Sequence, residues 1–164
     1  MVGRGACRLA SAQLRILESW RCSSWPNALS KNRAWRCHDG SCVSGAKGEP
    51  AQPAHYVPAY LKARGYRVLP VNPTRAGERI LGEAVAATLA DLREPADVVE
   101  VFRRPQFLPG HAAEIARLPW KPSVVWFQLG IRHDGAAEML ARAGIRVVQD
   151  RCMMPEHRRL LGAA

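Results

Sequence analysis

Short apolar runs that each stop at a polar or turn residue dominate the second two thirds of the chain. In Gly65-Tyr66-Arg67-Val68-Leu69-Pro70-Val71-Asn72-Pro73, an apolar strand follows a glycine and ends where Pro73 cannot continue a ladder of hydrogen bonds. Three later runs have the same form, and the run at 123–128 is apolar on both faces, as expected of a central parallel strand. The pattern predicts four strands, at 66–71, 97–102, 123–128 and 145–149.

Segments with helical spacing alternate with these strands. Tyr56, Val57, Tyr60 and Leu61 form one apolar face of a helix that ends at Gly65. The predicted helices are 54–64, 109–118, 134–143, which Asp134 can cap, and 155–161, with a polar loop at 74–82 and a short helical turn at 89–92. Strands that alternate with helices predict a doubly wound parallel α/β sheet with right-handed crossovers, and a fifth strand should precede Gly45.

Length and composition restrict this fold to one domain of ordinary size. The chain has 164 residues, of which 48% are hydrophobic and 23% charged, which is normal for a globular protein. No apolar run approaches the roughly 20 residues that span a bilayer. We therefore expect a cytoplasmic protein without membrane contact.

The net charge of +10 raises the question of a nucleic-acid partner. Residues 1–50 hold eight Lys/Arg against three Asp/Glu, and residues 51–164 hold sixteen against eleven, so the excess is concentrated at the N-terminus. No run of cations interleaved with aromatic residues is present. Nucleic-acid binding is therefore disfavoured, whereas a basic surface that holds phosphate is compatible with the charge.

Residues 1–44 differ from the rest in composition. They are rich in Arg, Ser, Trp and Cys, and only Leu14 to Trp20 could form a short helix. An organelle transit peptide has such a composition, but we favour a segment unrelated to the following domain and a candidate for disorder. Four of the five cysteines precede residue 43, and their number and spacing argue against a disulfide framework. Zinc on Cys37, His38 and Cys42, with Cys22 or His55, is disfavoured because no second ligand pair follows.

The residues that end the predicted strands are the candidates for chemistry. They should meet at the carboxyl edge of the sheet, where open α/β sheets bind ligands. Arginines there favour an anionic ligand with phosphates, and Gly45 and Gly48 could let backbone amides approach a pyrophosphate, although strand-end arginines often only pair with neighbouring helices. The candidates are Asn72, Arg103, Arg104, Gln128, Gly130 and Arg151.

Several enzyme and nucleotide motifs are not found in the sequence. Gly45 and Gly48 lack the full G-x-G-x-x-G pattern, Asn72 stands where a dinucleotide site needs an acid, and no G-x-x-x-x-G-K-[ST] loop occurs. Cys152 could be a nucleophile with His55, His111, His133 or His157 as base, but nothing in the sequence pairs them. We interpret Cys152 as structural.

In combination, these stretches resemble one family. The matching stretches are His55-Tyr56-Val57 with Tyr60-Leu61, Gly65 to Pro73, Gly77 with Leu81-Gly82-Glu83, Asp97 to Arg104, Trp126 with Gln128-Leu129-Gly130, and Asp150-Arg151-Cys152 with Glu156 to Arg159. Residues 45–162 resemble the small bacterial CoA-binding domain proteins, Rossmann-like domains related to the CoA-binding domain of the succinyl-CoA synthetase α subunit. The resemblance divides the chain into the segment 1–44 and a CoA-binding domain at 45–164.

The resemblance implies that coenzyme A (CoA) or an acyl-CoA lies across the carboxyl edge of the sheet, and no agreed reaction comes with it. The implied contacts are Gly45, Ala46, Lys47, Asn72, Pro73, Phe102, Arg103, Gln128 and Gly130. We therefore expect a binding protein without catalysis. The alternatives are an enzyme that uses an acyl-CoA or nucleotide at the same edge, and an interaction or nucleic-acid protein led by the basic segment.

The first unit departs from the family pattern. Lys47 stands where the family has serine, and Gln52 and Ala54 flank Pro53 where the family has an arginine and a serine. The first strand is the element that this sequence supports least, because His38 and Asp39 would be costly to bury there. We hypothesise that the coding frame or the start was altered upstream of about residue 43.

Overall fold

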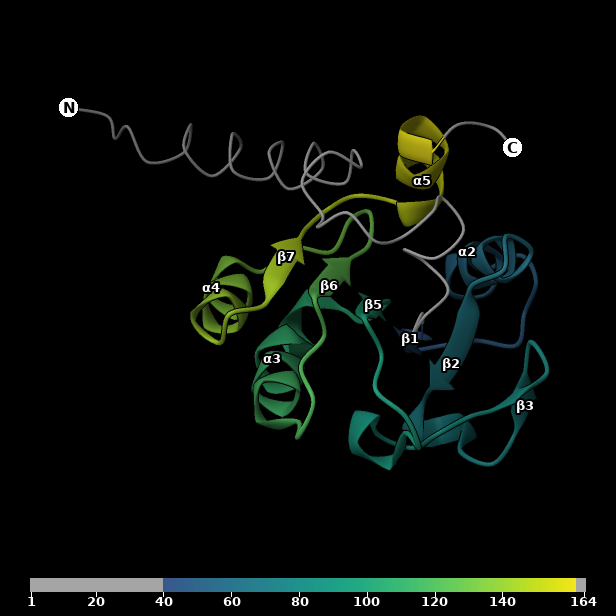
Figure 1. Cartoon of the computed structure of the whole chain (residues 1–164), viewed down its shortest axis with the longest axis horizontal. Helices are drawn as coiled ribbons and strands as arrows, with labels where there is room; N and C mark the ends of the chain where they lie inside the picture. The colour runs from purple at the N-terminus through teal and green to yellow at the C-terminus, as the bar shows by residue number, and fades with distance from the viewer. Residues whose placement is uncertain (1–39, 162–164) are drawn as a thin grey trace, which may run out of the picture.

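A five-stranded parallel sheet forms the centre of the structure (Figure 1). This computed structural model describes residues 40–161, with side chains for 45–159. The order of the strands across the sheet is β2-β1-β5-β6-β7. Their bounds are β1 Gly40–Ser44, β2 Arg67–Val71, β5 Val98–Val101, β6 Val124–Phe127 and β7 Arg146–Val148.

Two helices cover each face of the sheet. Helices α2 (Pro53–Lys62) and α5 (Met153–Leu161) contact each other on one face, and α3 (Leu108–Arg117) and α4 (Asp134–Arg142) pack together on the other (Figure 1). Successive strand residues point to opposite faces. Val99 and Val101 therefore join the core under α3 and α4, whereas Val98 packs with the core under α2 and α5.

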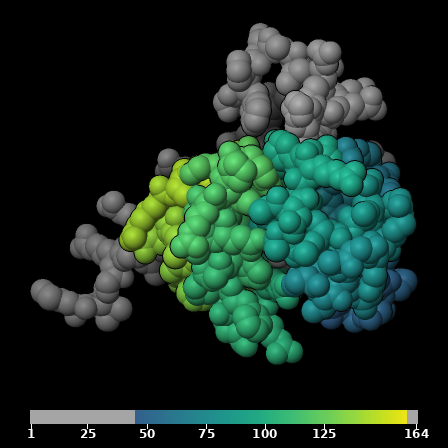
Figure 2. Space-filling view, turned by 90° about the horizontal axis from the view of Figure 1, so that it is seen from below, coloured from purple at the N-terminus to yellow at the C-terminus, as the bar shows by residue number. Residues whose placement is uncertain are grey.

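Short elements connect β2 to β5. Strands β3 (Arg79–Ile80) and β4 (Glu83–Ala84) form a small antiparallel hairpin. Its Ile80 packs with Val68 of β2 on the α2 side of the sheet. Three short 3-10 helices are η1 (Pro73–Arg75), η2 (Leu89–Asp91) and η3 (Pro105–Phe107). Figure 2 shows that the surface of residues 100–150, in green and yellow-green, lies directly against the teal and blue surface of the preceding segments.

The predicted fold is confirmed, and some local details differ. The strand expected before Gly45 is β1, which pairs with β2 and β5 at the centre of the sheet. The segment 74–82 is not loop alone, since it contains most of η1 and strand β3. The cap of α4 is His133, whose Nδ1 accepts a hydrogen bond from the Ala136 amide, and Asp134 is the first residue of the helix.

Two sets of expectations fall outside what is described. The predicted helix at 14–20 and the candidate ligands Cys22, Cys37 and His38 lie before residue 40. Within residues 40–161, no helix is long and apolar enough to cross a bilayer. Among residues 45–159, whose side chains are described, no group of three or more His, Cys, Asp or Glu residues could bind a metal ion.

Candidate functional site

The loop after β1 turns sharply at the carboxyl edge of the sheet. Gly45 has a φ of +89°, and a Cβ there would lie 3.1 Å from the carbonyl oxygen of Phe102. A glycine is needed for both reasons, since positive φ and close backbone approach each disfavour a side chain. This turn brings the loop after β1 against the end of β5.

Asn72, at the end of β2, holds this loop in place. Its side-chain Nδ2 donates to the Ala46 carbonyl at 2.8 Å, and its Oδ1 accepts from the amide and hydroxyl of Thr74 at 3.1 and 2.9 Å. Asn72 is buried, and both its donor and its acceptor have partners within the chain. The residue therefore shapes the loop. The adjacent Pro73 is exposed as the first residue of η1.

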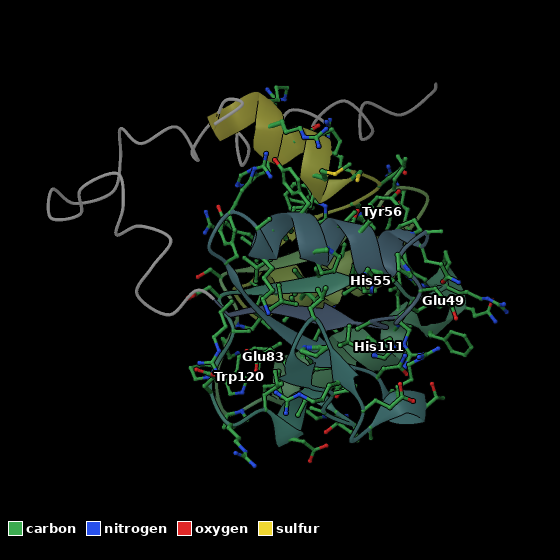
Figure 3. The ribbon with its side chains drawn as sticks, turned by 90° about the vertical axis from the view of Figure 1, so that its right-hand side faces the viewer. Glu49, His55, Tyr56, Glu83, His111 and Trp120 are labelled. Carbon is green, nitrogen blue, oxygen red and sulfur yellow. The ribbon has the colours of Figure 1, made fainter. Side chains whose placement is uncertain are left out.

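The start of α2 follows this loop and offers positive potential. Its N-cap residue Gln52 makes no side-chain capping bond, and its first turn contains no acidic residue. Both features favour an anion at a helix N-terminus. Glu49 pairs with Arg75 at 3.4 Å, and the Lys47 carbonyl bonds with His55 Nδ1 at 2.9 Å. Figure 3 shows Glu49 and His55 at the same end of the sheet as His111, away from Glu83 and Trp120.

Arg103 and Arg104 complete the cationic side of the edge, directly after β5. No carboxylate lies in ion-pair distance of Lys47, Arg103 or Arg104 among the described side chains. The Arg103 Nε is buried without a hydrogen-bond partner, and its Cδ lies 3.5 Å from the Cβ position of Gly45. Arg103 is thus packed against the loop, and its guanidinium has no ion-pair partner among the described side chains.

The ends of β6 and β7 differ, because their polar groups bond to one another. The Gly130 amide donates to Asp150 Oδ1 at 2.7 Å, and the Arg151 guanidinium pairs with Glu156 at 3.0 Å. The Gln149 side chain accepts from the His133 amide at 2.9 Å. Gly130 and Arg151 are therefore engaged in joining β6, β7 and the helices that follow them.

Gln128 connects three elements beneath this part of the edge. Its Nε2 donates to Glu100 Oε1 in β5, and its Oε1 accepts from the Met153 amide at the start of α5, at 3.3 Å. Glu100 is fully buried, and its second oxygen, Oε2, has no partner among the described residues. Burial raises the pKa of this carboxyl from 4.5 to about 8, against the opposing effect of the Gln128 hydrogen bond.

Cys152 and the four candidate histidines do not form a nucleophile-and-base pair. Each histidine has a hydrogen-bond partner other than Cys152, as His157 does between the hydroxyls of Tyr60 and Tyr66 at 3.1 and 2.9 Å. Burial raises the pKa of the Cys152 thiol, and burial lowers the pKa of His157. The thiol is thus held protonated, which opposes nucleophilic chemistry.

The parallel sheet of order β2-β1-β5-β6-β7 defines a Rossmann-like architecture, in which the order of the strands reverses between β1 and β5. A family model described as CoA binding domain matches residues 41–158. The chain belongs to this family of CoA-binding domain proteins.

Relatives and solved structures agree with this assignment. The uncharacterized protein YneT of Bacillus subtilis (strain 168) is 35% identical over 115 residues, which cover 70% of this chain and 82% of that protein. The structure of cell-free ID.343 from Thermus thermophilus is 50% identical with a TM-score of 0.71, and the match covers 75% of this chain and 90% of that one. The dinucleotide-forming acetyl-coenzyme A synthetase 1 of Ca. Korarchaeum cryptofilum, at 17% identity and a TM-score of 0.57, shares the fold over 70% of this chain and 27% of its own.

Sequence reasoning placed the candidates at one edge but missed Glu100. An acid at the fourth position of Asp97-Val98-Val99-Glu100-Val101 stands in a strand that is otherwise apolar and has neighbours on both sides. This position could have predicted a buried acid, because a central parallel strand buries both of its faces. The pairing of Gln128 with Glu100 could not be predicted without the register of β5 and β6.

Proposed function

We propose that this protein binds CoA or an acyl-CoA at the carboxyl edge of the sheet, without catalysis of its own. The observation that carries the proposal is the set of cations Lys47, Arg103 and Arg104, which the described side chains leave without carboxylate partners. Membership of the CoA-binding domain family supports the choice of ligand.

The shape of the β1 side supports a phosphate-bearing ligand. The uncapped start of α2 supplies the positive end of a helix dipole, which favours a pyrophosphate. Gly45, Ala46 and Asn72 form the turn that lies against Arg103 and leads into the loop before α2. A guanidinium can hold phosphate oxygens with paired hydrogen bonds. Pro73 and Phe102 border the same turn and would contact the rest of the ligand.

Gln128 and Gly130, which the resemblance implied as contacts, enter the proposal differently. The Gln128 side chain and the Gly130 amide are both engaged within the chain. We propose that both residues hold the ligand edge in place, Gln128 from beneath by its bonds to Glu100 and Met153, and Gly130 from the side by its bond to Asp150. They are not the main polar anchors of the ligand.

Calorimetry with the full chain tests the proposal. CoA should bind with micromolar or tighter affinity, and dephospho-CoA will show how far the 3′-phosphate contributes. Arg103→Ala should weaken binding at least about tenfold, since a charge-assisted hydrogen bond contributes on the order of 1.5–3 kcal/mol. The absence of heat at millimolar CoA would reject the proposal.

The enzyme alternative has no specific support from the geometry, because Cys152 has a raised pKa and the histidines are bonded elsewhere. Incubation of the protein with acyl-CoA substrates, followed by measurement of free thiol, separates binding from turnover. Stoichiometric binding without thiol release is the expected result.

A further inference from the structure

Among the described side chains, Glu100 is the only ionisable one that is fully buried. It lies beneath the proposed ligand edge. It lies in β5, on the same face of the sheet as Phe102, which directly precedes Arg103. Strand neighbours place it between Val43 of β1 and Trp126 of β6. A movement of Glu100 would therefore shift Phe102 and Arg103, where β5 ends at the ligand edge.

The hydrogen bonds of Glu100 extend from β5 to α5. Gln128 Nε2 donates to Glu100 Oε1, and the Met153 amide donates to Gln128 Oε1 at 3.3 Å. The second carboxyl oxygen, Oε2, is buried and unpartnered among the described residues. One amide donor therefore serves the whole carboxyl group, which suits a neutral acid and leaves a carboxylate poorly stabilised.

Among the described side chains, no cation pairs with Glu100. Its register partners on β1 and β6 are Val43 and Trp126. The helices on this face contribute apolar Val57 and Leu61 from α2 and Met153 from α5. Cys152, before α5, is the titratable neighbour that the Glu100 charge affects, and that charge raises the pKa of its thiol; Arg158 of α5 acts on the same thiol in the opposite direction.

We propose that Glu100 is a positioning residue for the ligand edge, which binds CoA in the form whose buried Glu100 carboxyl carries its proton. Ionisation would place a negative charge between β5, β6 and α5, and Gln128 would be its one hydrogen-bond donor among the described residues. The polar groups must then rearrange or admit water, which shifts Gln128, the first turn of α5 and the end of β5 at Phe102. This inference rests on the proposed CoA binding, and it adds that binding is coupled to a proton.

The coupling has a defined sign. If CoA binds the protonated form, binding raises the pKa of Glu100, which is about 8 in the free protein. The affinity is then constant below that pH. Above it, the dissociation constant rises by about tenfold per pH unit, because the binding form is depleted by that factor.

The experiment compares the full chain with its Glu100→Gln variant. Glutamine keeps the shape and cannot ionise, so it mimics the protonated acid. Titrations with CoA run from about pH 6 to about pH 9.5, a range that brackets the free-protein pKa. The wild type should lose affinity above about pH 8, whereas the variant should follow only the titration of CoA itself, which acts equally on both proteins.

The outcomes separate the two proposals. Parallel pH profiles for the two proteins, with CoA bound at neutral pH, would overturn the role of Glu100 and leave the proposed function standing. Absence of CoA binding at every pH would reject the proposed function, and the coupling with it.

A second measurement covers the case in which the Glu100→Gln variant does not fold. NMR with carboxyl-labelled glutamate follows Glu100 in the wild type, with and without CoA. The carboxyl should titrate near pH 8 in the free protein and at higher pH with CoA bound. An unchanged midpoint on CoA addition, or a midpoint in the usual glutamate range, would overturn the inference.

Discussion

The two halves of the carboxyl edge carry similar residues in different states. On the side of β1 and β5, Lys47, Arg103 and Arg104 have no carboxylate partner among the described side chains. On the side of β6 and β7, Arg151 is paired with Glu156, and the Gly130 amide is bonded to Asp150. The β1 and β5 side, which we call the open half, has polar groups available for a ligand. The β6 and β7 side, which we call the closed half, uses its polar groups to hold the fold.

This difference shows that a position at a strand end does not by itself determine a residue's role. Arg103 and Arg151 both follow strands of the same sheet, and the sequence presents them as equal candidates. What separates them is Glu156, one turn into α5, which accepts from Arg151 at 3.0 Å. The packing of a helix thus decides whether a strand-end arginine stays available.

The largest expected effect concerns Glu100, which lies in β5, on the open half of the edge, and bonds to Gln128 after β6. Its pKa is raised from 4.5 in the unfolded chain to about 8 in the folded protein. The stabilising contribution is therefore complete below about pH 4.5, declines as the pH rises toward 8, and stays low above it, with a slope of at most about 1.4 kcal/mol per pH unit. Glu100→Gln should remove this slope.

Urea unfolding of wild type and Glu100→Gln between about pH 5 and pH 9 measures the effect, because the two stability curves should diverge as the pH rises. Gln128→Glu is not a suitable control, since it adds a second acid. Arg142→Ala is suitable, because it removes an exposed ion pair on α4 that is remote from Glu100. Identical pH slopes in wild type and Glu100→Gln would contradict the buried, neutral state of Glu100.

The next largest effect concerns Gly45, in the loop after β1 on the open half of the edge. Gly45→Ala forces a side chain into a φ of +89° and brings a Cβ to 3.1 Å from the Phe102 carbonyl. We expect a loss of about 1–3 kcal/mol in the free energy of unfolding, together with a large loss of CoA affinity, because the loop must move.

Thermal unfolding and CoA titration of the same preparation measure both quantities. Gly65→Ala is the matched control, since Gly65 also has a positive φ, of +90°, but its Cβ position has no neighbour within 4 Å. The control should lose stability and keep its CoA affinity. Equal losses of affinity in the two variants would show that the Gly45 turn has no special role in binding.

Matched arginine substitutions compare the two halves directly. Arg103→Ala should weaken CoA binding by about tenfold or more. It should lower the free energy of unfolding only slightly, because Arg103 has no ion pair among the described side chains. Arg151→Ala should leave CoA affinity within about threefold and lower stability by on the order of 1 kcal/mol, because it frees the partly buried Glu156 from one of its two partners. Calorimetry and urea unfolding give the two readouts. An equal loss of CoA affinity in Arg151→Ala and Arg103→Ala would contradict the difference in role between the two halves.

The sequence predicts the fold more completely than it predicts the roles of individual residues. The strands at 67–71, 98–101, 124–127 and 146–148 follow from apolar runs, and each lies within its predicted range. Local signals also place Asn72, Arg103 and Gln128 at one edge. Their division into ligand-facing and internally bonded groups depends on contacts across the sheet, such as Gln128 with Glu100 and Asn72 with Ala46, which no local pattern contains.

The smallest expected effect concerns the link between β6 and β7. Asp150 has a φ of +54° and accepts from the Gly130 amide at 2.7 Å. Asp150→Asn keeps an oxygen acceptor and a residue that tolerates this backbone region, so the cost should stay below about 1 kcal/mol. Asp150→Ala loses both features and should cost about 1–2 kcal/mol more. Since this link belongs to the closed half, CoA affinity should stay unchanged in Asp150→Asn, and a marked loss of affinity there would extend the ligand surface to β7.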